Sequence, residues 1–275
     1  MAFLPEIGIR NFDDLACFEA KMTLDERLPE RSILDVFVAA AARWPNCTAL
    51  TMLMTGEHDE PARRVSYREL LRLVRGAANL FARLGGQRPG VAYMLPSMVE
   101  THATLWGAET AGYAVPINFL LQPEHIAGML KASGARILVA LGPHPVLDIW
   151  QKALALRDQD PGLKLLRVAA PGTPAMAGVL DFHAALMAEA DDRLMFGEPG
   201  RDDAVAAYFH TGGAALHRRQ RIDEAPPVRP SWSRTRIAVN SWLRSAARFW
   251  ATCAPATHSR PHCRFSTWAG PSPAA

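Results

Sequence analysis

Residues 88–118 read RPGVAYMLPSMVETHATLWGAETAGYAVPIN, and this stretch decides the fold. Its two ends, GVAYML (90–95) and YAVPIN (113–118), read as short buried strands. Between them, Ser97 and Glu100 have the S-x-x-E spacing of a capping box, which predicts a helix that starts here and ends at Gly112. The stretch therefore predicts a strand, a helix and a second strand in direct succession.

The same alternation continues on both sides of this stretch. Ser66 and Glu69 form another predicted capping box, and the helix after it stops at Gly85-Gly86. Its apolar positions recur at three- and four-residue steps: Leu70, Val74, Ala77, Phe81 and Leu84. Further predicted strands are TALTML (48–53), ARILVAL (135–141), LKLLRVAA (163–170) and AVAAYF (204–209), and further predicted helices begin at Ser32, at Pro123, near Val146 and at Asp181. Short strands alternating with amphipathic helices predict an α/β fold, a mainly parallel sheet with helices on both faces.

Length and composition limit the class of protein. A chain of 275 residues is long enough for one large domain or two small ones, and 49% hydrophobic with 21% charged residues is typical of a soluble globular protein. The first residues show no secretory signal, and no apolar stretch reaches the length of a membrane span. The four cysteines form no CxxC pair, so we expect no metal knuckle or redox motif and a reduced, cytoplasmic setting.

The composition changes abruptly at residue 213. Residues 1–213 contain 20 basic and 25 acidic residues, whereas residues 214–275 contain 10 arginines, no lysine and two acidic residues. This second part also has four of the seven tryptophans and shows neither helical nor strand periodicity. We therefore predict two regions, an α/β domain over 1–213 and a basic, irregular and disordered tail over 214–275.

The last predicted strand runs into a glycine turn, His210-Thr211-Gly212-Gly213. Glycines let backbone N–H groups approach phosphate oxygens, and a threonine hydroxyl adds a donor. A nucleotide loop normally also contains a lysine, and none follows here. From the residues alone, the turn is either the start of a phosphate loop or an ordinary turn.

Other polar residues have structural interpretations. His102 is interpreted as a packed or partly exposed helix residue rather than a general base. Asp148, Lys152 and Arg157 are interpreted as one solvated helix face. We assign no catalytic residue and no metal ligand from the sequence.

Several segments resemble the amino-terminal part of the adenylate-forming enzymes, the family of acyl-CoA synthetases and AMP-dependent ligases. RRVSYRELLRLVRGAANLFARLG (63–85) resembles the TYxEL helix of that family, and residues 88–118 resemble its GDxVAxxLPNSxExxxxxxGxxxAGAVxxPxN segment. LQPEHIAGMLKASGARILVA (121–140) is similar to the next helix and strand, and AYFHTGG (207–213) to the start of the phosphate loop. The resemblance covers about residues 30–213.

This resemblance implies an ATP-dependent ligase. Such enzymes join a carboxylic acid to AMP with release of pyrophosphate, use Mg²⁺, and then transfer the acyl group to CoA. Only His210, Thr211, Gly212 and Gly213 can be assigned, as the start of the ATP phosphate loop. The family loop continues with Thr-Thr-Gly-x-Pro-Lys, but Ala214 and the residues after it depart from that pattern. The resemblance therefore implies the amino-terminal portion of a ligase that is truncated and inactive as written.

A change of reading frame explains why the resemblance stops inside a motif. When HCRFSTWAG (262–270) is read from the third base of each codon, the His–Cys junction must encode Leu and the Trp–Ala junction must encode Gly. The codons between and after them permit L-P-L-F-H-V-G-G, which resembles the family's LPLFHxxG element. In the same register, SWSRTRI (231–237) permits V-x-H-x-N, similar to the family's LTHxN stretch. We interpret the tail as out of frame.

An alternative function remains open for the tail. Ten arginines interleaved with Trp232, Trp242, Trp250 and Trp268 have the charges and rings to bind a nucleic acid or an acidic partner. The chain would then be a non-enzymatic α/β binding or scaffold protein. The tail lacks the periodicity of an RNA-binding fold, so we favour the ligase interpretation and expect no nucleic-acid partner.

Overall fold

The structure is a computed structural model, and it describes residues 10–22, 26, 29–53, 56, 58–170, 172–200, 204–210 and, as backbone, 232–235. The statements below apply to these residues. Among them, no helix is both long and apolar enough to cross a membrane.

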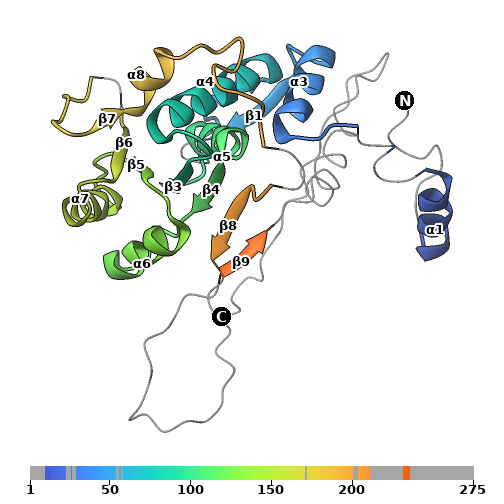
Figure 1. Cartoon of the computed structure of the whole chain (residues 1–275). Coiled ribbons are helices and arrows are strands. Elements are labelled where there is room, and N and C mark those ends of the chain that lie inside the picture. The colour runs from blue at the N-terminus through green and yellow to red at the C-terminus, as the bar shows by residue number, and fades with distance from the viewer. Residues whose placement is uncertain are drawn as a thin grey trace, which may run out of the picture.

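A seven-stranded sheet in the order β7-β6-β5-β3-β4-β8-β9 forms the centre of the described chain (Figure 1). The strands from β7 to β8 are mutually parallel, and β9 pairs antiparallel with β8. Their bounds are β3 (Gly90–Met94), β4 (Tyr113–Pro116), β5 (Ile137–Leu141), β6 (Lys164–Val168), β7 (Leu180–Asp181), β8 (Ala207–His210) and β9 (Trp232–Thr235). The prediction of a mainly parallel α/β sheet is confirmed.

Helices cover both faces of the sheet, and alternate residues of β3, β4, β5 and β6 are buried in two separate cores. Val91 and Tyr93 of β3 belong to one core, and Ala92 and Met94 belong to the other. The first core contains residues of α4 (Tyr67–Gly85), α5 (Val99–Ala111) and α8 (Phe182–Met187). The second contains residues of α6 (Pro123–Ser133) and α7 (Ile149–Gln159). Burial on both faces is the usual reason why strands of parallel sheets are apolar throughout.

The start and end of α4 follow the predicted pattern. The Ser66 hydroxyl accepts from the Glu69 N–H at 3.3 Å, and the Glu69 carboxylate accepts from the Ser66 N–H at 2.8 Å. Gly86 follows the helix with φ of 76°, a conformation that favours glycine. The predicted apolar face lies inward: four of its five residues are buried, and Leu84 is partly buried.

The predicted capping box at the start of α5 is wrong. The N-cap is Met98, no side chain caps this end of the helix, and Ser97 is exposed. Glu100 is buried and bonds to side chains from two other elements. The rest of α5 packs closely against α4, and a Cβ added at Gly107 would lie 2.5 Å from the Ala77 Cβ. The pattern located the helix correctly but misassigned its carboxylate.

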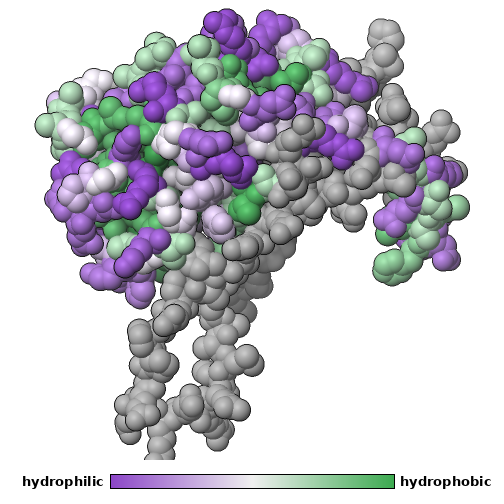
Figure 2. Space-filling model, in the orientation of Figure 1, coloured by the Kyte–Doolittle hydropathy of each residue, from purple (hydrophilic) through white to green (hydrophobic). Residues whose placement is uncertain are grey.

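A second, two-stranded sheet lies beside α4. β1 (Thr48–Met52) pairs antiparallel with β2 (Arg63–Ser66), and α3 (Ile33–Arg43) packs against α4 and α5. Ser32 caps α3 as predicted, in a capping box with Asp35. The sequence predicted β1 but not β2. α1 (Phe12–Lys21) has no buried residue, and Figure 2 shows both hydrophilic and hydrophobic residues on its surface.

The predicted tail lies mostly outside the described residues. Of residues 214–275, the structure describes only the backbone of β9, which continues the sheet next to β8. The division into a domain over 1–213 and a disordered tail therefore stays a prediction.

Candidate active site

A cleft of about 390 Å³ opens at the carboxyl ends of β3, β4 and β8. The chain leaves β3 for α5 on one face of the sheet and leaves β4 for α6 on the other face (Figure 1). In open α/β sheets, ligands bind where neighbouring connections diverge in this way. The lining residues are Tyr93, Leu95, Ser97, Thr101, His102, Leu105, Pro116, Ile117, Asn118, Phe119, Phe209 and His210.

His210 ends β8 at the edge of this cleft. Its Nε2 accepts a hydrogen bond from the backbone N–H of Asn118 at 3.2 Å. This bond ties the end of β8 to the end of β4. The other predicted loop residues, Thr211, Gly212 and Gly213, lie outside the described residues, so the assignment of the loop stays a prediction.

His102 lies on the α5 side of the cleft. Its Nδ1 donates to the Met98 carbonyl oxygen at 2.8 Å, and its ring centroid is 5.2 Å from that of Trp106. The side chain is half-buried, as the sequence interpretation expected. Thr101, one residue earlier, donates to the Pro96 carbonyl at 2.5 Å and so joins the start of α5 to the loop after β3.

Lys152 supports the opposite wall of the cleft. Its ammonium donates to the Phe119 carbonyl oxygen at 2.9 Å and lies 3.0 Å from a carboxylate oxygen of Asp148. The Lys152 side chain is only 10% exposed, so its interpretation as part of a solvated face is wrong. A lysine stem packs well among apolar residues when its charge finds partners at its end. These bonds attach α7 to the segment after β4.

Tyr93 in the cleft wall and Glu109 on α5 are two buried ionisable groups. Burial raises the pKa of Glu109 to about 8, so this α5 carboxyl is mostly protonated at neutral pH. Burial also raises the pKa of Tyr93, and the negative charge of Glu109 adds to that effect. Groups with strongly shifted pKa values often gather near functional sites, although burial alone produces them too.

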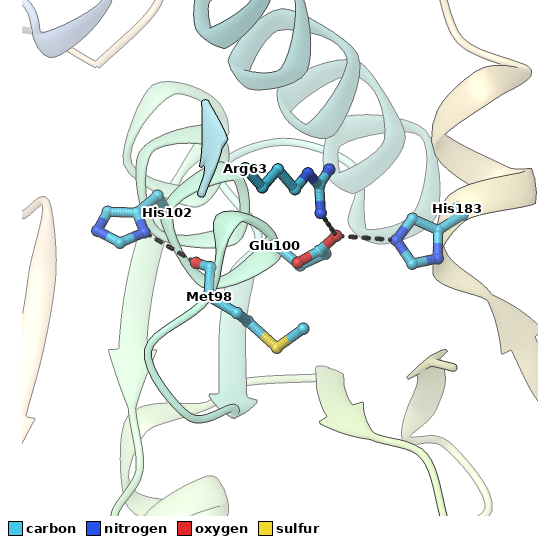
Figure 3. A network of polar contacts seen from close by, with 5 residues as sticks. All are labelled: Arg63, Met98, Glu100, His102 and His183. Carbon is cyan, nitrogen blue, oxygen red and sulfur yellow. Dashed lines mark hydrogen bonds and ion pairs between the residues drawn. The ribbon is translucent and has the colours of Figure 1, made fainter. Parts of the chain in front are cut away.

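A polar network joins three elements on the other side of α5 (Figure 3). Glu100 Oε1 lies 3.3 Å from a guanidinium nitrogen of Arg63 on β2 and 3.1 Å from Nε2 of His183 on α8. Figure 3 shows Glu100 and His102 projecting from α5 in different directions, so this network is separate from the cleft. Glu100 Oε2 is buried without a hydrogen-bond partner.

The described residues fit only part of a nucleotide site. The part of the cleft wall formed by described residues combines apolar side chains with hydroxyl, amide and imidazole groups and includes no lysine or arginine. A triphosphate site normally also has a mobile positive charge. Within the described part of the chain, no group of three or more His, Cys, Asp or Glu residues could hold a metal ion.

Sequence reasoning missed several residues around the cleft. Asn118 could have been suspected, because a polar residue that ends a buried parallel strand lies at the ligand-binding edge. No local pattern reveals Glu109, since a glutamate within a helix is usually exposed. The same holds for Lys152, whose burial depends on a carbonyl 33 residues away.

The sheet and its edge cleft define an open, mainly parallel α/β domain with a cleft at the carboxyl ends of its strands. A family model described as "AMP-binding enzyme" matches residues 37–214, and the chain belongs to this family. The curated Marinolic acid--CoA ligase of Pseudoalteromonas sp. (strain SANK 73390) is 33% identical to it over 206 residues. That match covers 74% of this chain and 31% of the relative.

Solved structures share the fold at low sequence identity. Acetoacetyl-CoA synthetase from Streptomyces lividans superposes with a TM-score of 0.55 at 20% identity, over 66% of this chain and 28% of that chain. The inhibitor-bound N-terminal domain of FACL13 from Mycobacterium tuberculosis gives 0.51 at 22% identity, over 68% and 43%. The chain thus spans about a third of the length of the curated relative and under half of these structures.

Proposed function

We propose that residues 1–213 are the amino-terminal portion of an ATP-dependent acyl-CoA synthetase. The observation that carries this proposal is the family match over residues 37–214, which includes β8, the strand whose last residue lines the cleft. The relative that is 33% identical is named as a CoA ligase, which supports the same class of reaction. The proposal includes a cytoplasmic setting, where ATP, Mg²⁺ and CoA are available, and a part in fatty acid metabolism.

The proposed reaction has two half-reactions. The carboxylate of the acid attacks the α-phosphorus of ATP, which gives an acyl-adenylate and pyrophosphate. The thiol of CoA then attacks the acyl carbon, and AMP leaves as the thioester forms. ATP supplies the activation of the acid, and Mg²⁺ supplies charge neutralisation.

In this proposal, His210, Thr211, Gly212 and Gly213 begin the ATP phosphate loop. The bond from the Asn118 N–H to His210 holds the exit of β8 beside the cleft. Beyond that exit, the glycines would let N–H groups approach phosphate oxygens without a Cβ in the way. Lys152, Thr101 and His102 position the walls rather than react.

We further propose that the chain does not catalyse this reaction as a 275-residue polypeptide. The described cleft wall has no cation, and the residues after Gly213 contain no Thr-Thr-Gly-x-Pro-Lys continuation. The family match ends where the composition changes, which supports the interpretation of residues 214–275 as out of frame.

Acid-dependent release of pyrophosphate by the purified chain tests this proposal. With a panel of short, long and aromatic carboxylic acids, we expect release no faster than in the absence of protein. A matched chain whose residues from 214 onward come from the alternative reading frame should bind ATP more tightly. Robust turnover by the 275-residue chain would contradict the inactivity. Translation of the gene in all frames without any ligase pattern would rule out the frame change.

The alternative, a binding protein with a basic tail, makes a different prediction. Residues 214–275 carry a net charge of +8, so binding to nucleic acid would weaken steeply as salt rises. We expect no binding to double-stranded or single-stranded DNA at physiological salt. Salt-dependent DNA binding at physiological salt, together with no ATP binding by the 275-residue chain or by the chain with the alternative reading frame, would favour the binding protein.

A further inference from the structure

His183 and Glu100 connect a short helix to the centre of the domain. α8 has only six residues, which is too short for a stable helix on its own, so it depends on tertiary contacts. Its apolar contacts come from Phe182, which is fully buried in the core beside α4 and α5, and from Ala185 and Leu186, which are partly buried against the same core. A polar contact adds to these: the hydrogen bond of His183 Nε2 to Glu100 at 3.1 Å, with Arg63 on the same carboxylate oxygen.

The charges around His183 favour its protonated form. Glu100 faces it from α5, Asp181 from the start of α8, and Arg63 from β2. The hydrogen bond to Glu100 raises the pKa of His183, burial opposes it, and the net shift is upward. On the neighbouring elements, Arg72 pairs with Asp191, Arg83 pairs with Glu189, and Arg167 donates to the Pro174 carbonyl.

Glu100 is charged at the pH values at which His183 is protonated or begins to lose its proton. Burial raises its pKa, but the His183 hydrogen bond and the Arg63 charge outweigh burial, so its pKa lies below the ordinary value. Charge-assisted hydrogen bonds of this kind are stronger than neutral ones. Both side chains are therefore charged at pH values between the pKa of Glu100 and the pKa of His183.

We propose that Arg63, Glu100 and His183 form a proton-dependent clamp that holds α8 against α5 and β2, and that α8 loosens when His183 loses its proton. The direction of the pH dependence, tighter at low pH and looser at high pH, follows from the raised pKa of His183. The stabilisation is complete below the ordinary histidine value of 6.5 and is lost as pH rises through the higher folded-state value. Phe182 keeps α8 attached, so the loosening is local.

The chain contains an internal control for this clamp. The segment after α8 is held by Asn79, whose amide donates to the carbonyls of Ala190 and Arg193 and accepts from the Met195 N–H at 2.8 Å. Asn79 does not titrate. Protection of the Met195 amide should therefore not respond to the protonation of His183.

Amide hydrogen exchange of the full chain, corrected for intrinsic rates, tests the clamp from about pH 5.5 to about pH 8.5, a range that brackets the ordinary histidine pKa. We expect protection of the Leu186–Ala188 amides to fall roughly threefold to fivefold, as when a charge-assisted hydrogen bond becomes neutral. His183→Gln should flatten this response, and the control His125→Gln, at an exposed position, should keep it. Equal loss at Met195, or the same loss in His183→Gln, would overturn the proposal.

A second measurement does not depend on the folding of a His183 variant. The NMR titration of His183 in the unaltered chain should give a pKa above the ordinary value. Glu100→Gln should bring it back toward that value. A titration of His183 that is the same with and without the Glu100 charge would contradict the clamp.

Discussion

At the start of both α4 and α5, a serine before the helix stands three residues ahead of a glutamate in the first turn, and the two glutamates have opposite environments. Glu69 is exposed and caps its own helix, whereas Glu100 is buried and bonds to β2 and α8. α5 also buries Glu109, whose pKa is raised rather than lowered. The difference teaches that the partners around a carboxyl group decide its role. A capping carboxylate needs only the backbone N–H groups at the start of its own helix, whereas a buried carboxyl group must either pair with a cation or take up a proton.

The largest effect is expected at Glu109. Burial raises its pKa from 4.5 to about 8, so the folded chain resists the ionisation of Glu109. The resulting destabilisation is absent below pH 4.5 and grows as the pH rises toward 8. Glu109→Gln should therefore stabilise the chain at pH 7, by about 2–3 kcal/mol. Urea denaturation at several pH values measures this. A variant with the same pH dependence as the unaltered chain would show that Glu109 is not buried as a neutral acid.

A smaller effect is expected at Glu100. Glu100→Ala removes the shared acceptor of Arg63 and His183, and both partners can reach water because they are 59% and 43% exposed. We expect a loss of about 2 kcal/mol, less than for a fully buried ion pair. Denaturation at pH 6 checks this. The matched change Glu69→Ala should cost about 1 kcal/mol, as a lost capping contact does. A stability loss for Glu69→Ala that equals or exceeds the loss for Glu100→Ala would contradict the comparison.

The smallest effect separates the two serines. Ser66→Ala should destabilise the chain by about 1 kcal/mol, because it leaves the Glu69 N–H without its acceptor. Ser97→Ala should stay within about 0.5 kcal/mol, since Ser97 is exposed and caps no helix. Thermal melts of both variants make the test. A comparable loss for Ser97→Ala would mean that this serine has a role beyond the contacts described above.

The alternation of strands and helices could be predicted because each element is defined by local spacing. The capping box of α4, its apolar face and its glycine stop are all contained within about twenty consecutive residues. The pairing of β2 with β1 and the bonds of Glu100 and Lys152 could not be predicted. His183 lies 83 residues from Glu100, and Phe119 lies 33 residues from Lys152. Such contacts depend on how the helices pack, which no local pattern contains.

The candidate site was only partly visible in the sequence. The resemblance marked His210 and the glycine turn; His210 ends β8 at the cleft, while the assignment of these residues to a phosphate loop stays a prediction. The contributions of Asn118, Thr101 and Phe119 follow from the strand order β3-β4-β8, which brings residues from distant segments to one edge. Strand order depends on the whole chain, so sequence reasoning marked His210 and missed the cleft residues that come from the other strands.

The late position of β8 in the chain has a consequence for the order of folding. Its described parallel register with β4 is a single pair, Ala114 with Ala207, separated by 93 residues. By contrast, β3, β4, β5, β6 and β7 all lie between residues 90 and 181 and can pair without it. Long-range pairings form late because loop closure costs entropy before it gains contacts. On the ribosome, the sheet can therefore close while the cleft still lacks its third strand, and the site is assembled last.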